Sequence, residues 1–238
     1  MPHPTVRAVV LGHAQDAGVP QAGCRCARCR AAWADPARQA LPACLGVVDA
    51  ADGAAWLVDA TPALPAQLHA LVGAGDAPSP RLAGIVLTHA HIGHYAGLVH
   101  LGREAMGARG LPVLASPAMA AYLRANAPWR QLVELGNIAL REVDAGAPVA
   151  LSARLSLAFA PVPHRAEWSD THAVVVAGPA RRLLWCPDID GWARLDDGLV
   201  GLLLAHRIDI ACLDATFLTP DELGGRDASE VPHPLAGD

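Results

Sequence analysis

The amino-acid sequence predicts one α/β domain in which two mixed sheets pack face to face and helices cover the outer faces. A length of 238 residues suits one large domain. Hydrophobic residues make up 53% of the chain and charged residues 17%, which is enough apolar material for a core and argues against disorder. Short β-like runs alternate with helical stretches and include antiparallel hairpins, the pattern of such a layered fold. A single domain spanning residues 1–238 is therefore expected.

The first half of the chain predicts strands that end beside polar or glycine-rich loops. Thr5–Leu11 has the pattern of a first strand, and a Gly- and Cys-rich loop follows it. Asp52-Gly53 is a two-residue hairpin signal between strands at Leu45–Val48 and Ala55–Val58. The further elements expected here are a helix at Leu64–Val72, a strand at Gly84–Leu87, a helix after His94 that runs to about Met106, a strand at Pro112–Ala115 and a helix at Pro117–Asn126.

The second half predicts strands that each deliver a polar residue at their ends. Strands are expected at Ile138–Val143 and Ala153–Ala160, and the latter leads to His164. A hairpin turns at Gly178-Pro179 and leads to Asp188. The strands of this hairpin and the last expected strand are Thr171–Ala177, Arg181–Cys186 and Ile208–Leu213, the last ending at Asp214.

Charge and hydropathy restrict the class of partner. The formal net charge is -5 and the basic residues are scattered, so neither a nucleic-acid backbone nor an anionic membrane surface is an expected partner. The N-terminus lacks a signal pattern, and the longest late apolar run, Leu199–Ala205, is far below the ~20 residues that cross a bilayer. We expect a cytoplasmic protein that acts on a small molecule. Its oligomeric state is left open, with a homodimer as one option.

Histidines and an aspartate at strand ends predict a metal site. His89 and His91 lie two residues apart at a strand end, where both side chains point the same way, and His94 begins the next helix. His164 and Asp188 follow two later strands. Imidazole and carboxylate ligands suit zinc, iron or manganese. A local hydrogen bond for each histidine is the alternative, which three histidines within six residues disfavour.

Six cysteines are expected to be reduced in the cytoplasm. Cys24, Cys26 and Cys29 are spaced as three corners of a tetrahedral metal site, and a fourth ligand must come from elsewhere. A redox thiol or a bare loop is the alternative. Buried packing is expected for the isolated cysteines, which are Cys44, Cys186 and Cys212.

Several motifs carry a resemblance to a known superfamily. Leu87-Thr88-His89-Ala90-His91-Ile92-Gly93-His94 resembles the HxHxDH signature of the metallo-β-lactamase superfamily, whose αββα sandwich fits the predicted fold class. More narrowly, the chain resembles the pyrroloquinoline quinone (PQQ) biosynthesis protein B family. The matching segments include Gly18-Val19-Pro20-Gln21, Cys24-Arg25-Cys26-Ala27-Arg28-Cys29, Pro161-Val162-Pro163-His164-Arg165, Pro187-Asp188-Ile189-Asp190 and Leu213-Asp214-Ala215-Thr216-Phe217.

The resemblance implies a role for each metal-site residue. His89, His91 and His164 would hold a first metal ion, Asp188 would bridge to a second ion, and His94 would belong to the second. Asp59 would support the ligands through a hydrogen bond without binding metal, although a turn aspartate at a strand end is an equal alternative. Structural Zn²⁺ is implied at the cysteine cluster, and Zn²⁺, Fe²⁺ or Mn²⁺ at the histidines.

Two departures from the superfamily pattern alter this expectation. Gly93 stands where the superfamily carries an aspartate that ligates the second metal. The chain also stops before the last strand region of its relatives, which brings a final metal-binding histidine. His233 resembles the histidine that lies near the substrate in related enzymes, and a disordered tail is the alternative. We therefore expect one tightly bound metal ion and a weak second position.

The expected activity is metal-dependent hydrolysis of a small ester, amide or phosphodiester through a metal-bound hydroxide. His94 and Asp188 would position water, and His233 or Asp190 would donate a proton. One alternative is an iron-dependent oxidase or hydroxylase of PQQ biosynthesis, which the family resemblance implies. The other is a non-catalytic protein that binds or carries a quinone cofactor.

Overall fold

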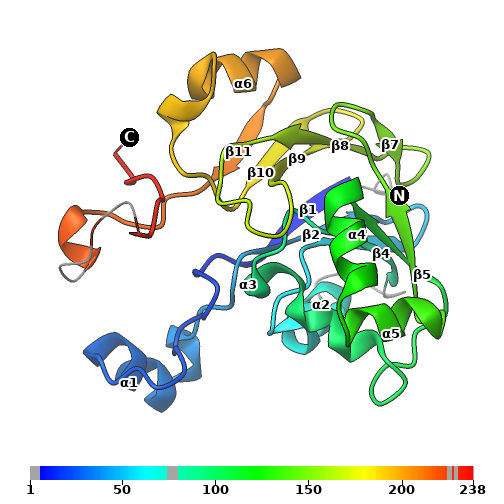
Figure 1. The fold of residues 1–238 in the computed structure, drawn as a ribbon, viewed down its shortest axis with the longest axis horizontal. Helices are drawn as coiled ribbons and strands as arrows, with labels where there is room; N and C mark the ends of the chain where they lie inside the picture. Colours follow the sequence, from blue (N-terminus) through cyan, green and yellow to red (C-terminus); the bar gives the residue numbers. More distant parts are fainter. Residues whose placement is uncertain (1–5, 74–79, 224–226, 228–229, 238) are drawn as a thin grey trace, which may run out of the picture. The chain divides into compact units, whose positions relative to one another are not determined.

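The computed structural model describes residues 6–73, 80–223, 227 and 230–237 and forms two compact units, Met1–Glu142 and Val143–Asp238. Each unit contains one mixed β-sheet together with helices (Figure 1). Two mixed sheets with helices are the α/β class that the sequence predicts. The single-domain boundary stays a prediction.

The sheet of the first unit has the strand order β1-β2-β3-β4-β5-β6. Strand β2 is antiparallel to both of its neighbours, and the pairs from β3 to β6 are parallel. Strands β1, β3, β4 and β5 therefore all point the same way, and their carboxyl ends lie at one edge of the sheet. The strands are β1 (Val6–Gly12), β2 (Cys44–Asp49), β3 (Ala54–Val58), β4 (Arg81–Val86), β5 (Leu111–Ala115) and β6 (Ile138–Glu142).

Several helices of the first unit pack on this sheet around one apolar core. Strands β2 and β3 are buried along their whole length. Their core side chains lie in one cluster with Leu64 and Leu71 of α2 and with Met119 and Leu123 of α4. The helices are α1 (Ala27–Ala34), α2 (Leu64–Gly73), α3 (Ile92–Tyr95), α4 (Pro117–Ala125) and α5 (Trp129–Glu134), with 3₁₀ helices η1 (Pro36–Arg38) and η2 (Ala96–Leu101).

Helix positions account for most differences from the sequence-based expectation in this unit. Helix α1 forms in the expected Gly- and Cys-rich loop, and α5 was not predicted. The long helix expected to run to Met106 is instead the short α3 followed by η2, which ends at Leu101. The backbone explains the change: the His94 carbonyl accepts from Ala60 N–H at 2.8 Å, and Gly97 N–H donates to the Ala60 carbonyl at 2.8 Å. The loop after β3 thus takes hydrogen bonds that a continuous α-helix would use.

Gly97 is required at this contact. A Cβ atom at Gly97 would lie 2.1 Å from the Thr61 carbonyl oxygen, which is a backbone atom. The close approach holds the loop after β3 against η2.

The predicted first strand began at Thr5, and Thr5 lies outside the described residues.

The sheet of the second unit has the order β11-β10-β9-β8-β7. Strand β9 is antiparallel to β8 and β10, and β10 is parallel to β11, so β8, β10 and β11 end at one edge of the sheet. The elements are β7 (Val149–Ala150), β8 (Ser156–Pro161), β9 (His172–Ala177), β10 (Arg182–Cys186), β11 (Ile210–Leu213), α6 (Gly198–His206), η3 (Trp192–Arg194) and η4 (Pro220–Leu223).

The second unit confirms the predicted hairpin and corrects one strand start. Strands β9 and β10 pair across Gly178-Pro179, as predicted. Strand β8 begins at Ser156 rather than at Ala153, because Leu151 and Ser152 form a turn with backbone bonds to the Leu155 carbonyl. Helix α6 and strand β7 were not predicted.

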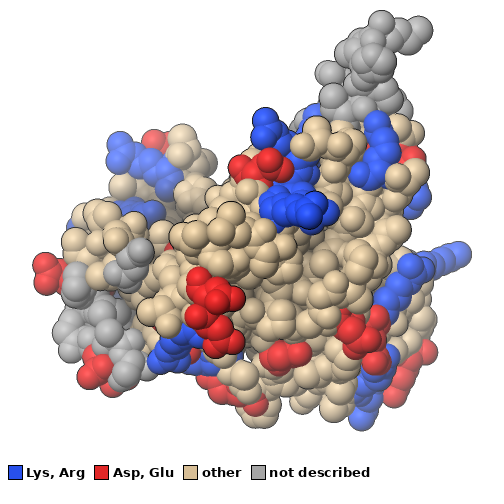
Figure 2. Space-filling view, turned by 90° about the horizontal axis from the view of Figure 1, so that it is seen from above, with Lys and Arg blue, Asp and Glu red and all other residues tan. Residues whose placement is uncertain are grey.

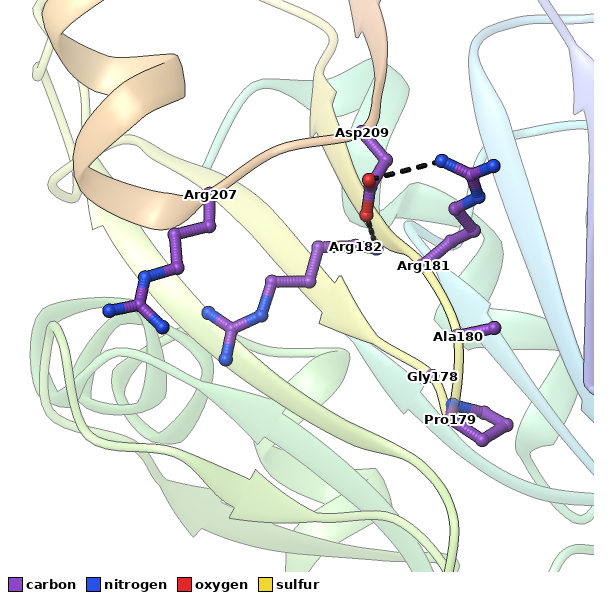
Figure 3. A pocket seen from close by; sticks show the side chains of 7 residues that line it. All are labelled: Gly178, Pro179, Ala180, Arg181, Arg182, Arg207 and Asp209. Carbon is purple, nitrogen blue, oxygen red and sulfur yellow. Dashed lines mark hydrogen bonds and ion pairs between the residues drawn. The ribbon is translucent and has the colours of Figure 1, made fainter.

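Asp209 fixes the start of β10 beside β11 (Figure 3). Its carboxylate accepts from the Arg182 backbone N–H at 2.7 Å and from the Arg181 guanidinium at 3.2 Å. These bonds lower the pKa of Asp209, the backbone bond most strongly. Arg207 lines the same shallow hollow and ends α6 with a left-handed backbone, φ +52°.

Candidate metal centre

A network of hydrogen bonds lies at the carboxyl edge of the first sheet and begins at Asp59. Asp59 follows β3 directly, is fully buried and has a left-handed backbone with φ +70°, a conformation that aspartate tolerates. Its carboxylate accepts from the Thr88 N–H at 2.9 Å and from the Thr88 hydroxyl at 3.0 Å. It also lies 2.8 Å from His94 Nδ1. Burial raises the pKa of Asp59, and the charge and hydrogen bonds of His94 and Thr88 oppose that rise.

This hydrogen-bond network determines which ring nitrogen of His89 and of His94 carries the proton. The Thr88 hydroxyl donates to Asp59, so it accepts from His89 Nδ1, which lies 2.9 Å away. His94 Nδ1 donates to Asp59. Both histidines thus keep an Nε2 lone pair, the form in which imidazole binds a metal. The supporting hydrogen bond that the resemblance implies for Asp59 is present.

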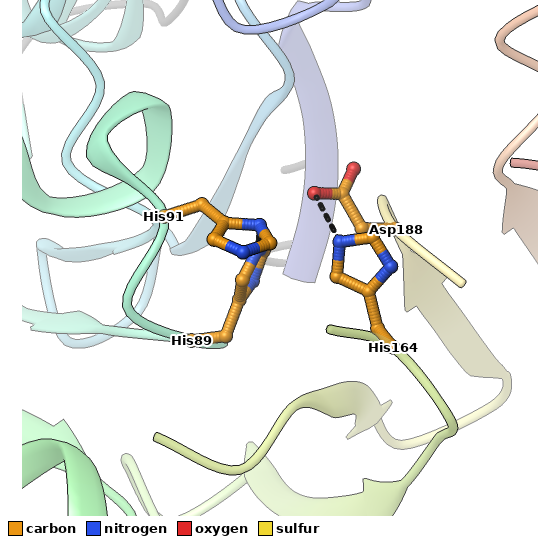
Figure 4. Close-up of side chains that lie close together, drawn as sticks. All are labelled: His89, His91, His164 and Asp188. Atoms are coloured by element: carbon orange, nitrogen blue, oxygen red, sulfur yellow. Dashed lines mark hydrogen bonds and ion pairs between the residues drawn. The ribbon is translucent and has the colours of Figure 1, made fainter. Parts of the chain in front are cut away.

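His89, His91 and His94 lie together, as the motif predicts. His89 Nε2 and His91 Nδ1 are 3.0 Å apart, and the rings of His89 and His94 are 4.2 Å apart between centroids. Figure 4 shows the His89 and His91 rings side by side. His91 caps α3 with extended backbone while His94 lies within that helix, so the turn brings both rings to the same side. His89 and His94 are 1% exposed.

The carboxyl edge of the second sheet carries His164 after β8 and Asp188 after β10. His164 Nε2 lies 3.6 Å from Asp188 Oδ2, an ion pair drawn in Figure 4. Its Nδ1 lies 3.0 Å from Asp190 Oδ1, and Asp190 also pairs with Arg194. His164 therefore repeats the arrangement of His94: one carboxylate holds Nδ1, and a second carboxylate faces Nε2.

His233 also belongs to this edge and is not in a disordered tail. Its Nδ1 lies 2.6 Å from Asp214 Oδ2, and its ring centroid is 5.2 Å from that of His164. Asp214, which follows β11, also accepts from the backbone N–H groups of Ile189 and Thr216. Burial lowers the pKa of His233, but the hydrogen bond and charge of Asp214 outweigh it, so the pKa is raised.

Gly93 has no side chain, and the carboxyl group of another residue occupies the space beside it. A Cβ atom built on Gly93 would lie 2.2 Å from Asp16 Cγ and 2.4 Å from Asp16 Oδ1. Asp16 Oδ1 also lies 3.1 Å from His94 Nε2. Asp16 follows β1, which ends at the same sheet edge as β3 and β4. Sequence reasoning missed Asp16, because its proximity to Gly93 depends on strand topology.

Cys24, Cys26 and Cys29 converge as predicted, with their sulfur atoms within 4.8 Å of one another. Cys26 is the N-cap of α1, and its sulfur accepts from Cys29 N–H at 3.4 Å. The Cys29 sulfur accepts from Gln21 N–H at 3.4 Å. The bond from Cys29 N–H lowers the pKa of Cys26 to about 7, since a backbone donor stabilises a thiolate.

The isolated cysteines are free thiols with different burial. Cys44 and Cys186 are fully buried, as predicted, whereas Cys212 is only partly buried. Burial raises the pKa of each of these three thiols, and those of Cys44 and Cys186 rise furthest. They therefore act as small apolar side chains.

The donor set at the histidines fits a divalent metal ion. Partners hold Nδ1 of His89, His94 and His164, which is the usual arrangement around bound zinc or iron. Nε2 of each ring lies beside another potential ligand, which is His91 for His89, Asp16 for His94 and Asp188 for His164. Within the second unit, Asp188 adds a carboxylate oxygen beside His164. Imidazoles with a carboxylate suit zinc, iron or manganese.

Two further features concern the charge of the surface and the character of the helices. Acidic and basic side chains are interspersed over the face that Figure 2 shows. Within the part of the chain that the structure describes, no helix has both the length and the apolar character to span a membrane.

Comparison with known proteins identifies the class. The model of the beta-lactamase superfamily domain matches residues 55–235, most of the chain. The chain therefore belongs to the metallo-β-lactamase superfamily. Within it, the chain is PqqB-like: it is 28% identical over 235 residues to coenzyme PQQ synthesis protein B of Methylobacterium sp. (strain 4-46), covering 92% of this chain and 75% of that protein.

Two solved structures share the fold. Zn²⁺-bound PqqB from Methylobacterium extorquens matches with a TM-score of 0.77 at 22% identity, over 97% of this chain and 81% of the other. A diphosphatase of the PhnP family matches with a TM-score of 0.65 at 22% identity, over 98% of this chain and 80% of the other. At these identities the matches define the fold and leave the activity open.

Proposed function

We propose that this protein is a metal-dependent enzyme of PqqB type, acting on a small-molecule precursor in the synthesis of a quinone cofactor. The observation that carries the proposal is the shared state of His89, His94 and His164: a partner holds Nδ1 of each ring, and Nε2 of each ring lies beside another potential metal ligand. Three buried histidines in this shared state are difficult to explain as ordinary buried polar groups. The curated relatives bear the name coenzyme PQQ synthesis protein B.

The two sheet edges are proposed to serve one metal centre. The first unit contributes His89 and His91, and the second contributes His164 and Asp188. One superfamily domain spans both units, from residue 55 to residue 235, which supports their action as one functional domain. His94 would belong to a second metal position, and Asp188 would serve both positions.

When bound, the metal would supply Lewis acidity or, if it is iron, redox chemistry. The residues of the chain around it have separable roles. Asp59 and Asp190 orient His94 and His164. Asp190 accepts from His164 and from Arg194, so these contacts favour an orienting role over the proton donation expected from sequence. His233 is held by Asp214 with a raised pKa and is the better proton donor.

A small neutral or anionic molecule is the proposed substrate class. Nucleic acid is not proposed, because the net charge is -5 and basic residues do not gather on the face that Figure 2 shows. Hydrolysis of an ester, amide or phosphodiester is the second candidate activity. The carboxylate of Asp16 beside His94 favours it, because a second metal position is common in hydrolases of phosphate esters.

Complementation tests the proposed function directly. The chain would be expressed in a Methylobacterium strain that lacks coenzyme PQQ synthesis protein B, and PQQ would be measured in the medium. Restored PQQ production is expected, with none from the His89→Ala variant. If the chain fails to restore PQQ but, as purified zinc protein, hydrolyses bis(p-nitrophenyl) phosphate or p-nitrophenyl acetate, the hydrolase candidate replaces the first. If neither activity depends on His89, the proposal of a metalloenzyme is wrong.

A further inference from the structure

The position beside Gly93 and His94 is the feature that the proposed function leaves unexplained. In the HxHxDH pattern an aspartate at this position would supply a metal ligand, and this chain has glycine. The loss of this ligand predicts that the second position binds its metal ion weakly. The structure instead places a carboxyl group there: the Cγ atom of Asp16 would lie 2.2 Å from a Cβ atom on Gly93. The absence of a side chain at residue 93 is thus what makes room for Asp16.

We propose that Asp16 replaces the missing aspartate and that Asp16 and His94 bind the second metal ion together. This inference rests on the proposed metal centre and adds a ligand that sequence reasoning did not find.

The chemistry of the Asp16–His94 contact calls for a cation. His94 donates Nδ1–H to the buried Asp59, so in its neutral form its Nε2 atom carries a lone pair. Asp16 Oδ1 lies 3.1 Å from that atom. A carboxylate oxygen and an imidazole lone pair repel each other at this distance unless a proton or a metal ion lies between them. Either cation would satisfy both groups.

The distance fits two ligands of one ion. Ligand atoms of zinc lie about 2.0–2.2 Å from the metal, so two of them at near-tetrahedral angles are roughly 3.3 Å apart. The separation of 3.1 Å between His94 Nε2 and Asp16 Oδ1 is close to this value.

The backbone holds Asp16 in place before any metal binds. Ala14 N–H donates to the Leu41 carbonyl at 2.9 Å, which fixes the loop after β1 to the segment before β2. The Gln15 side chain accepts from Ala17 N–H at 2.7 Å and donates to the Gly18 carbonyl at 3.1 Å. Gly18, with φ +69°, closes the turn. Asp16 thus lies in a braced turn, and its side chain remains 42% exposed to an incoming ion.

Metal binding by the full-length protein tests the inference. Apo-protein would be titrated with Zn²⁺ by calorimetry, and bound zinc would be counted by elemental analysis after dialysis. Asp16→Ala is expected to lose one zinc equivalent, or to bind it at least 10-fold more weakly, while the remaining equivalents stay bound. Asp16→Asn should weaken the same equivalent with less change in the turn. The matched control is Asp52→Asn, an exposed aspartate in the β2–β3 hairpin.

Rescue distinguishes a ligand from a residue that merely supports the loop. Gly93→Asp alone should be poorly stable, because the new Cβ atom collides with Asp16. The double variant Asp16→Gly/Gly93→Asp removes that collision, whereas Asp16→Ala would leave a Cβ atom 2.6 Å from the new one. It restores a carboxylate beside His94 and should regain the lost zinc equivalent. Thermal melting of the apo-proteins shows which variants are folded.

Each outcome decides the inference. If Asp16→Ala and Asp16→Asn bind as much zinc as the wild type with equal affinity, the inference is wrong and a shared proton joins Asp16 to His94. A double variant that folds but does not regain zinc would also overturn it. If His89→Ala and His164→Ala leave every zinc equivalent bound, the proposed metal centre itself fails, which is a different result from failure at Asp16 alone.

Discussion

Asp59 illustrates how one buried side chain sets the chemistry of its neighbours. It accepts hydrogen bonds from Thr88 and His94, and through Thr88 it also determines which nitrogen of His89 is protonated. Its sequence context, an aspartate at a strand end, equally suits a turn. Only the structure shows that the carboxylate points into the histidine cluster, because its left-handed backbone turns the side chain toward β4.

Asp59→Asn is predicted to disturb the histidines without creating a cavity. The amide would place an NH₂ group toward either Thr88 or His94, and one donor would then face another donor. We expect a loss of about 1–3 kcal/mol in the free energy of unfolding. We also expect zinc affinity at His94 to fall roughly 10–100-fold, since Asp59 orients that ligand. Urea denaturation and zinc calorimetry measure the two effects.

Asp35→Asn is the control for this substitution, because Asp35 is an exposed cap at the end of α1. It should change the free energy of unfolding by no more than a few tenths of a kcal/mol and should leave the zinc affinity at His94 unchanged. Unchanged zinc affinity in a folded Asp59→Asn protein would contradict the orienting role.

Among single residues, the histidine motif was the most predictable part of the site. His89, His91 and His94 are close in sequence, so local geometry alone brings them together. Asp16 and Asp214 were not assigned to the site from sequence, because their positions depend on the order and direction of whole strands. A strand-end aspartate is common, and nothing in its own neighbourhood marks it as a partner of a distant histidine.

At the scale of elements, Gly97 joins η2 to the loop after β3. Gly97→Ala is predicted to lower the free energy of unfolding by about 1–3 kcal/mol, because the added methyl group must displace the Thr61 carbonyl. Urea denaturation provides the measurement. Gly102→Ala is the matched control, since its nearest neighbour is the flexible end of Glu104 at 3.2 Å. Equal stability of the two variants would show that the Gly97 contact can relax.

The cysteine cluster is a second element-scale feature, because it caps α1 and closes the loop before that helix. We predict that Cys26→Ser lowers the melting temperature by several degrees and leaves metal bound at the histidines. The serine would weaken both the N-cap contact with Cys29 and any zinc held by the three thiols. Calorimetric melting and zinc counting test this. Loss of the histidine metal with unchanged stability would contradict the prediction.

Strands and hairpins were predicted better than helices. The β2–β3 and β9–β10 hairpins carry glycine turn signals with apolar runs on either side, so local sequence defines them. Helix α1 has a cysteine rather than a usual polar residue as its N-cap, which hid its start. The early end of α3 depends on hydrogen bonds from the Ala60 loop, a tertiary contact that periodicity does not encode.

At the scale of the whole molecule, the proposed metal centre draws ligands from both compact units. His89→Ala and His164→Ala change residues in different units, and each is predicted to remove the same zinc ion. The double variant should then lose no more zinc than either single variant. His94→Ala should keep this ion, because that residue is assigned to the second position. Elemental analysis after dialysis gives the counts.

His69→Ala is the control for these variants, because His69 is an exposed residue of α2. A loss of zinc from His89→Ala and His164→Ala that adds in the double variant would mean that each unit binds its own ion. The superfamily assignment rests on motifs spread over the chain and was predictable from sequence.

The contact between Asp16 and Gly93 also limits how this lineage can evolve. A carboxylate fits at one of the two positions but not comfortably at both, because a Cβ atom at residue 93 would overlap the Asp16 side chain. Homologues should therefore divide into two groups, one with aspartate in the loop after β1 and glycine in the histidine motif, and one with the reverse. An alignment in which the two positions vary independently would show that the exchange is not a compensation. If they covary, this pair of positions marks a branch point in the family.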